Sequence, residues 1–436
     1  MITTYDYIES NKRKTILLIL LFPVSLMFIL FAVFCFALWC FPEMRANNSP
    51  VVSQVINSYW EIFIGCILLS VIWTAIAFYG GSNMIVGMVN ATKLQDEPNT
   101  YSSDLKNFLE KFSITEDIPK AKISREEIRK ILENVSSKEK IPTPNLYIVK
   151  DEAELKPFSV GTIADSAVIL TKSYIEISDK SKIEAFITRQ ISIIILQDKK
   201  REAKRILENI SITAGIPTPK FYILEDEKGL NAFATGTTEK NCAVILTRGL
   251  LETLDKSEIE AVIAHEIAHI IYQDTKLMMV ITLLIGFFTY CGYLILRTLE
   301  FRDRRSRSSK KDSKAVFIIL LIGVAFIIYG YVVAPLIRLA VSRTREFHAD
   351  AKSALLTRNP QALISALRKI ENYPIVSVLN SRYNNNELVA PMCIENPLRK
   401  KVSLFDSLSN LSSTHPPIEK RIQALEVMDG RSLFPY

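Results

Sequence analysis

Long apolar runs interrupt an otherwise mixed chain at four places. Thr15–Phe41 is almost wholly apolar, and Ile62–Tyr79, Leu277–Leu296 and Ala315–Ile337 carry no charged residue. Each run is long enough to cross a hydrocarbon layer of ~30 Å as a helix. We expect four membrane-embedded helices. The first two are expected to span, and the last two to form a hairpin that either crosses the membrane or enters it only in part.

A helical period governs the segment from Asp255 to Asp274. Apolar residues recur there at helical spacing, Asp255 is a suitable N-cap, and Glu258 follows three residues later, as in a capping box. This helix contains the pattern H-E-x-x-H at His265, Glu266 and His269. Residues four apart share a helix face, so both imidazoles can bind one Zn²⁺ while Glu266 takes a proton from metal-bound water. The alternative is a pair of unrelated buried histidines.

A tetrahedral zinc site needs a further protein ligand. Glu346 and Asp350 share a face of the expected helix around residues 342–351. Glu346 can bind the metal while Asp350 accepts a hydrogen bond from a ligand imidazole, and a solvated charged face is the alternative. Farther on, His415 precedes two prolines and can stabilise a developing oxyanion, with Arg421 supporting it.

Strand signals precede the H-E-x-x-H helix. Phe221–Leu224 and Ala243–Thr247 are β-branched or aromatic runs bounded by Pro and Gly. Between them, the stretch that begins Asn231, Ala232, Phe233, Ala234 can form an exposed strand that pairs with the main chain of a peptide. An ordinary structural strand is the equally open alternative.

An internal repeat lies between the second apolar run and this helix. The segments 131–134 and 167–170 recur as 206–209 and 243–246. In this alignment His265, Glu266 and His269 correspond to Arg189, Gln190 and Ile193. The first copy therefore keeps the apolar pattern but lacks metal ligands and a base. It can pack against the second copy, bind substrate without cutting it, or act as a scaffold.

Net charge limits the classes of binding partner, and cysteine spacing limits the kinds of cysteine site. The chain has 436 residues, 49% of them hydrophobic, and a formal net charge of +7. The loop 297–314 alone contributes +5, from eight Lys/Arg against three acidic residues, so the basic balance favours lipid headgroups and we expect no nucleic-acid partner. The six cysteines lack the spacing of a disulfide framework or a zinc ribbon.

Together these blocks resemble the HtpX family of integral-membrane zinc metallopeptidases and its gluzincin relatives, which include the CAAX prenyl endopeptidases. The resemblance rests on residues 11–15, 231–236, 265–269, 342–350 and 413–421. It implies one Zn²⁺ per chain bound by His265, His269 and Glu346, with Glu266 as the general base. It also implies that Asp350 orients a ligand histidine, that His415 helps to stabilise the oxyanion, and that Asn231–Ala234 forms the strand that binds the substrate. The extra copy, roughly 122–198, departs from the family pattern.

The expected fold class is an α+β membrane protein. Transmembrane helices carry a zincin-like peptidase domain of helices and a small sheet, beside a duplicated, degenerate peptidase-like unit. The expected divisions are a membrane region (1–80), a linker with the degenerate copy (81–198), a peptidase unit (199–276), the hydrophobic hairpin (277–340) and a C-terminal helical part with the third zinc ligand (341–436).

The expected function is that of a membrane-anchored zinc metalloendopeptidase that hydrolyses peptide bonds by zinc-activated water. Basic residues 12–14 precede the first apolar run, whereas the following loop, 42–58, carries only Arg45, which predicts a cytoplasmic N-terminus and active site. The resemblance implies a bacterial inner membrane, membrane-protein substrates and a role in quality control. A non-catalytic adaptor or scaffold and a CAAX-type prenyl-protein endopeptidase are the alternatives. The sequence carries no signal of oligomeric state.

Overall fold

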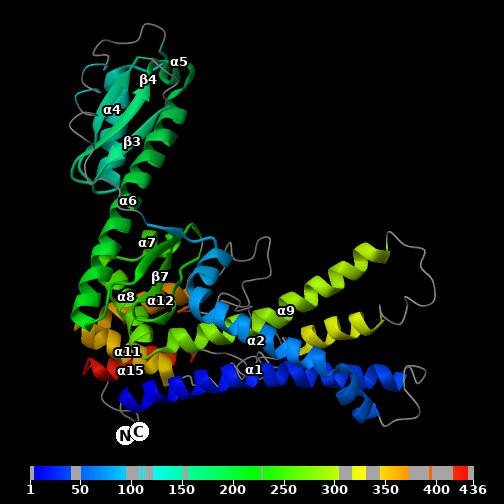
Figure 1. The fold of residues 1–436 in the computed structure, drawn as a ribbon. Helices are drawn as coiled ribbons and strands as arrows, with labels where there is room; N and C mark the ends of the chain where they lie inside the picture. The colour runs from blue at the N-terminus through cyan, green and yellow to red at the C-terminus, as the bar shows by residue number, and fades with distance from the viewer. Residues whose placement is uncertain are drawn as a thin grey trace. The chain divides into compact units, whose positions relative to one another are not determined.

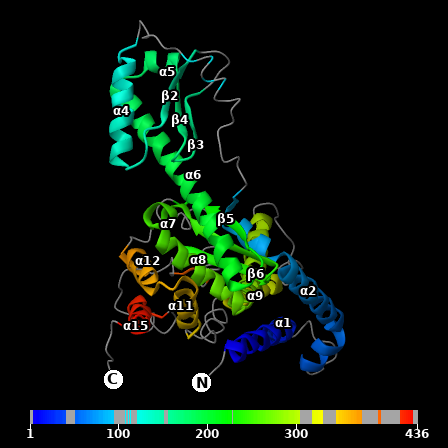
Figure 2. The same ribbon diagram turned by 90° about the vertical axis from the view of Figure 1, so that its left-hand side faces the viewer.

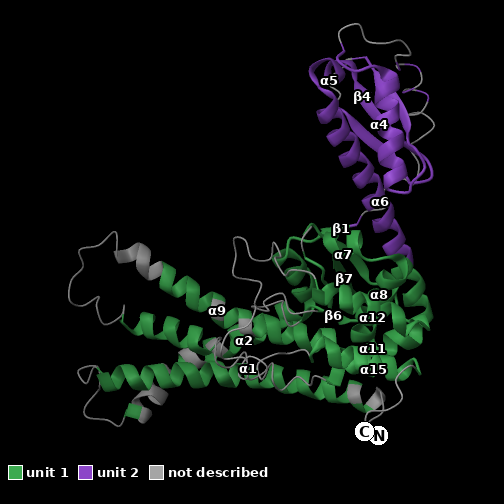
Figure 3. Ribbon diagram, turned by 180° about the vertical axis from the view of Figure 1, so that it is seen from behind, with its two compact units in different colours: residues 1–93, 206–436 green, residues 94–205 purple. Residues whose placement is uncertain are grey.

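The computed structural model describes residues 4–40, 51–94, 107, 109, 111, 113, 121–150, 156–226, 229–303, 317–329, 344–372, 392–394 and 416–430. Two compact units divide the chain (Figure 3). Unit 1 comprises residues 1–93 and 206–436, and unit 2 comprises residues 94–205. The division expected at residue 198 falls inside one helix, α6 (Lys180–Ala214), which runs from unit 2 into unit 1.

Among the residues that the structure describes, three helices of unit 1 are long and apolar enough to cross a membrane. These are α1 (Thr4–Cys40), α2 (Val51–Met88) and α9 (Asp274–Asp303), with apolar stretches at Ile8–Cys40, Ile67–Met88 and Asp274–Arg297. They pack against one another in pairs (Figure 1), and Leu20 and Phe28 of α1 remain 64% and 72% exposed, as lipid-facing side chains do. Of the fourth predicted run, the structure describes a shorter apolar helix, Phe317–Tyr329.

Unit 1 also contains a four-stranded sheet. Its order is β1 (Thr92–Lys93), β5 (Lys220–Leu224), β7 (Asn241–Thr247) and β6 (Ala232–Thr238), so β6 is the last named strand at one side. β5 and β7 are parallel, and β6 runs antiparallel to β7. Helices α7 (Arg248–Thr253) and α8 (Lys256–Ile271) contact this sheet. Helices α11 (Thr344–Thr357) and α12 (Pro360–Asn372) pack against α8, and α15 (Ile418–Met428) packs against α11 and α12.

Helix α8 forms where the apolar period predicted it. Asp255 caps its first turn in a capping box with Glu258, whose carboxylate also accepts hydrogen bonds from Ser365 and Lys369 of α12. The helix ends at Ile271, and Gln273 then takes a left-handed conformation with φ of 59°. Because α9 begins at the next residue, α8 passes into a candidate membrane helix within two residues.

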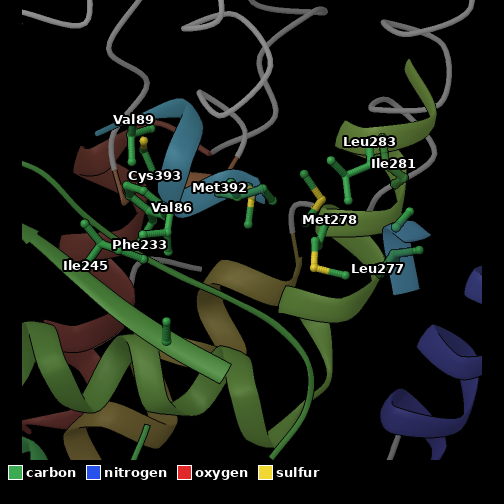
Figure 4. Packing of buried hydrophobic residues seen from close by; sticks show 14 of the residues in the cluster. Val86, Val89, Phe233, Ile245, Leu277, Met278, Ile281, Leu283, Met392 and Cys393 are labelled. Carbon is green, nitrogen blue, oxygen red and sulfur yellow. The ribbon is translucent and has the colours of Figure 1, made fainter. Parts of the chain in front are cut away.

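An apolar cluster joins the strands to the membrane helices. Val86 of α2 and Val89, just after that helix, meet Phe233 of β6, Ile245 of β7, and Leu277 and Met278 of α9, as Figure 4 shows. Met392 and Cys393, which follow α12 in the chain, complete the cluster. This packing fixes β6 and the start of α9 in the same core.

Unit 2 contains α4 (Arg125–Lys138), α5 (Lys172–Ile177), the first part of α6, and a sheet of order β2 (Asn145–Val149), β4 (Ser166–Thr171), β3 (Phe158–Gly161). Helices α4 and α6 lie side by side in Figure 2 and pack on the same face of this sheet through Ile128, Leu132, Ile183 and Ile187. The unit therefore has its own core.

The two sheets repeat the same topology and register. Asn145 pairs with Ala167 as Lys220 pairs with Ala243, and Phe158 pairs with Ile169 as Phe233 pairs with Ile245. Each copy has three strands rather than the two that the sequence indicated most clearly. The observed architecture of helices, small sheets and candidate membrane helices confirms the predicted fold class.

Candidate metal centre

Three side chains from two helices converge on one point in unit 1. His265 and His269 of α8 and Glu346 of α11 present ligand atoms that all lie within 4.8 Å of one another. The two Nε2 atoms are 3.1 Å apart, and they lie 3.7 and 3.8 Å from the carboxylate oxygens of Glu346. A tetrahedral Zn²⁺ with bonds near 2.0–2.1 Å has ligand atoms about 3.3 Å apart, so this donor set fits zinc.

A carboxylate lies at the outer nitrogen of each imidazole. Asp350 Oδ1 is 3.0 Å from His265 Nδ1, and Asp274 Oδ2 is 2.9 Å from His269 Nδ1. Such contacts fix the tautomer that leaves Nε2 free to bind metal. Asp350 is in turn held by Arg421, whose Nε and Nη2 donate to its two oxygens at 2.8 and 2.7 Å.

Burial and charged neighbours shift the pKa values of these groups in opposite directions. Burial lowers the pKa of His265, but contacts with Asp350 and Glu346 outweigh it and raise that pKa to about 9. Burial also raises the pKa of Asp350, and the neighbouring Arg421 outweighs it and holds that pKa below its usual value. A cation at this point therefore competes with a proton on His265, as metals do at histidine sites.

Glu266 is fully buried beside the ligands. Neither of its carboxylate oxygens has a hydrogen-bond partner among the described residues. Its pKa is raised, chiefly by burial and also by Glu346. A buried carboxylate without a partner is costly in a purely structural role, which suits a group that takes up a proton from a bound molecule.

A pocket opens onto this centre. Its lining includes Glu266, His269, Glu346, Ala234 of β6 and Met392. Cys393 forms an antiparallel bridge with Phe233, and the Ile394 N–H donates to the Ala232 carbonyl at 2.9 Å. The first residues of β6 thus already have a neighbour on their outer edge, and Ala234 is the residue of β6 that faces the pocket.

The structure brings most of the predicted residues together. His265, His269, Glu346, Glu266 and Asp350 form one cluster. Arg421 bonds Asp350 and also approaches Glu346 at 3.5 Å. Ala232, Phe233 and Ala234 lie on β6, and the Asn231 side chain accepts a hydrogen bond from the Ala232 N–H. His415 lies outside the described residues, so its proposed role at the oxyanion stays a prediction.

Sequence reasoning missed several residues around the centre. Asp274 was considered only as the end of the helical segment, although a carboxylate soon after H-E-x-x-H was a usable signal. Arg345 is buried, and its Nε lies 3.2 Å from Glu346 Oε1, but the sequence pattern assigned it no role. Met278 and Met392 line the pocket and also belong to the apolar cluster. No pattern in their surrounding sequence distinguishes them from other apolar residues.

The sequence matches Peptidase family M48 over residues 197–429, which include the three candidate ligands and Glu266. A protease HtpX homolog of Bacteroides fragilis is 39% identical over 232 residues, or 52% of this chain and 70% of the relative. One of Dictyoglomus thermophilum is 41% identical over 227 residues, or 52% of this chain and 69% of the relative. The crystal structure of S. mikatae Ste24p aligns at 21% identity and a TM-score of 0.33, covering 51% of this chain and 49% of that one.

A buried His-His-Glu group beside apolar helices of membrane-spanning length defines the class, an integral-membrane metallopeptidase. The chain belongs to peptidase family M48, and the resemblance to the HtpX group predicted from the sequence is confirmed.

Proposed function

We propose that this membrane metallopeptidase is a zinc endopeptidase that cuts polypeptide chains, membrane proteins among them. The observation that carries the proposal is the convergence of His265, His269 and Glu346 next to the unpartnered carboxylate of Glu266. Both imidazoles already face carboxylates, so the ligands are oriented for a metal by their protein surroundings.

The chemistry divides between the metal and this chain's own side chains. Bound Zn²⁺ would supply Lewis acidity, which lowers the pKa of water and polarises a carbonyl. Glu266 takes a proton from the attacking water and passes it to the nitrogen of the leaving amine. Its raised pKa suits the first step, because a stronger base accepts the proton more readily. His415 is proposed to stabilise the oxyanion, and Arg421 holds Asp350 against His265.

Strand β6 is the proposed docking edge for the substrate. A peptide laid antiparallel to β6 would bring a carbonyl over the pocket at Ala234, which Glu266 and His269 also line. Ala232 and Phe233 form the part of the edge that Cys393 and Ile394 accompany, and Asn231 is proposed as the residue that leads into it. The substrate backbone therefore pairs from Ala234 onward, or takes the place of these two residues.

The proposed location is the cytoplasmic face of a bacterial inner membrane. The basic residues 12–14 precede α1, and basic residues favour the cytoplasmic side. A site on that side of the membrane suits the quality control of membrane proteins that the relatives' family implies. The proposed centre holds one Zn²⁺ per chain.

Detergent-purified protein and its Glu266→Gln variant test the proposal together. Each is assayed for bound zinc and for cleavage of casein, an unfolded substrate. We expect about one zinc per chain in both proteins, with cleavage only in wild type and loss of cleavage on chelation. Zinc without cleavage of any unfolded or membrane substrate would favour an adaptor, and the absence of zinc would overturn the metal assignment.

A further inference from the structure

The second carboxylate–histidine contact continues into the first membrane helix. Asp274 accepts a hydrogen bond from Asn11 Nδ2 through Oδ1 at 2.8 Å, while its Oδ2 faces His269 Nδ1 at 2.9 Å. Asn11 belongs to α1, and the same Nδ2 also donates to the Tyr272 carbonyl at 3.0 Å. One amide group therefore contacts both the end of α8 and the start of α9.

These residues are shielded from solvent. Asn11, Asp274 and His269 are 3%, 2% and 9% exposed. Hydrogen bonds between buried polar groups are directional and costly to leave unmade, so each member constrains its neighbours. The left-handed Gln273 allows Asp274 to follow His269 by only five residues and still turn its carboxylate to the ring.

The surrounding packing keeps α1 in place. Ile8 packs against Ala268 and Tyr272 at the end of α8, and Phe22 meets Phe287 and Phe288 of α9 in edge contacts. Asn11 lies between these two apolar contacts along α1. The position of its amide is thus fixed by the seating of the membrane helix.

The two imidazoles are held from different parts of the chain. The carboxylate behind His265 is oriented by Arg421 of α15, whereas the carboxylate behind His269 is oriented by Asn11 of α1. We propose that Asn11 is a positioning residue of the metal centre, which holds Asp274 against His269 and so makes this ligand depend on the seating of α1. The inference rests on the proposed metal role of His269.

The test measures zinc affinity rather than turnover. Full-length protein in detergent is titrated against a competing zinc chelator, and the Co²⁺-substituted forms are compared by visible absorption. We expect Asp274→Asn to weaken zinc binding about 10- to 100-fold and Asn11→Ala about 10-fold, with altered Co²⁺ bands, because partners behind a ligand tune affinity by such factors. The variant Asn11→Asp, which sets two carboxylates face to face, should be weaker than Asn11→Ala.

Two variants of the same helix serve as controls. Thr15→Val removes a buried hydrogen bond of α1, from Thr15 Oγ1 to the Asn11 carbonyl, without touching Asp274. Arg13→Ala removes an exposed ion pair with Glu9. Both should keep wild-type zinc affinity, and Thr15→Val should lower only thermal stability.

The outcomes separate the inference from the proposed function. If Asn11→Ala unfolds at a lower temperature but binds zinc as wild type does, Asn11 merely caps α8 and the inference is wrong. If Thr15→Val weakens zinc as much as Asn11→Ala, the effect belongs to the helix in general and the inference is also wrong. If wild type binds no zinc, the proposed function fails before the variants are compared.

Discussion

At the scale of single residues, Arg421 shows how much of the candidate centre depends on a buried side chain that is not itself a metal ligand. It is completely buried, bonds both oxygens of Asp350, and donates to the Ile394 carbonyl at 3.2 Å. A bidentate guanidinium–carboxylate pair in a buried site is strong only while both partners are present. Its loss leaves Asp350 as a buried charge that faces His265 alone.

The variant Arg421→Met should therefore destabilise unit 1 by about 3–5 kcal/mol, the usual cost of removing one partner of a buried ion pair. Thermal unfolding in detergent measures the change. The matched control is Arg368→Ala, whose partner Glu426 is on the surface and whose own side chain is 57% exposed, so about 1 kcal/mol or less is expected. Equal effects of the two variants would contradict this account.

At the scale of elements, the stability that the N-cap Asp255 gives to α8 depends on pH. Burial raises the pKa of Asp255, but hydrogen bonds from the Glu258 N–H and from Ser257 outweigh it and hold that pKa below its usual value. A folded-state pKa below the unfolded value of about 3.9 gives stability that is present above that pH and lost as pH falls through the folded value.

We expect Asp255→Ala to cost about 1 kcal/mol at pH 7, as losses of helix N-caps do. The difference from wild type should shrink as the pH falls below about 4, because the wild-type carboxylate then becomes protonated. Unfolding temperatures of both proteins between pH 3 and pH 7 provide the measurement. A difference that is constant across this range would show that the charge of the cap is not involved.

Both copies of the sheet need a glycine at or near the end of the antiparallel strand. Gly236 and Gly161 have φ of 142° and 107°, and an added Cβ would meet the backbone of Cys242 at 2.5 Å and of Ser166 at 2.7 Å. Gly236→Ala should cost about 3 kcal/mol or more and reduce peptide cleavage by displacing β6, whereas Gly161→Ala should destabilise unit 2 and spare zinc binding.

Zinc content, unfolding temperature and casein cleavage of both glycine variants check this prediction. Gly87→Ala is the control, since nothing lies within 4 Å of an added Cβ at that position of α2. Loss of zinc in Gly161→Ala would contradict the independence of the two copies.

Helices and strands could be predicted from the sequence where a local pattern of apolar residues determines them. The apolar period and the capping box gave α8 within a few residues, because both signals act within one or two turns. The contact of Asn11 with Asp274 spans 263 positions, and the bridge of Phe233 with Cys393 joins equally unrelated stretches. Such pairs depend on how helices pack in three dimensions, which no local pattern encodes. The spacing of Glu346 and Asp350 placed both on one face, yet only the fold brought that face to α8.

At the scale of the whole molecule, the candidate ligands and their carboxylate partners all belong to unit 1, and unit 2 has a separate core. Removal of zinc with EDTA should therefore lower the stability of unit 1 alone. The expected loss is about 4 kcal/mol if free zinc had been a thousandfold above its dissociation constant. Hydrogen–deuterium exchange, read peptide by peptide, should become faster in α8 and α11 and stay unchanged in α4 and β4. Equal acceleration in both units would contradict this prediction.

In the first copy, Gln190 stands where the second has Glu266, and Ser159 of the neighbouring strand donates to its amide oxygen at 2.8 Å. Glu266, which has no hydrogen-bond partner among the described residues, thus corresponds to a hydrogen-bonded Gln190 in the first copy. This contrast agrees with the sequence alignment, in which the first copy has no metal ligands.

Helix α6 serves both copies at once. Its first part corresponds to α8 and its last part to α4, so the copies share a helix and no linker separates them. As a consequence, one whole repeat can be removed without breaking the pattern of the chain. Deletion of residues 132–206, which is 75 residues, joins Ile131 to Leu207 and reproduces the sequence Ile-Leu-Glu-Asn at the junction. The shortened chain keeps the copy that carries His265, Glu266 and His269.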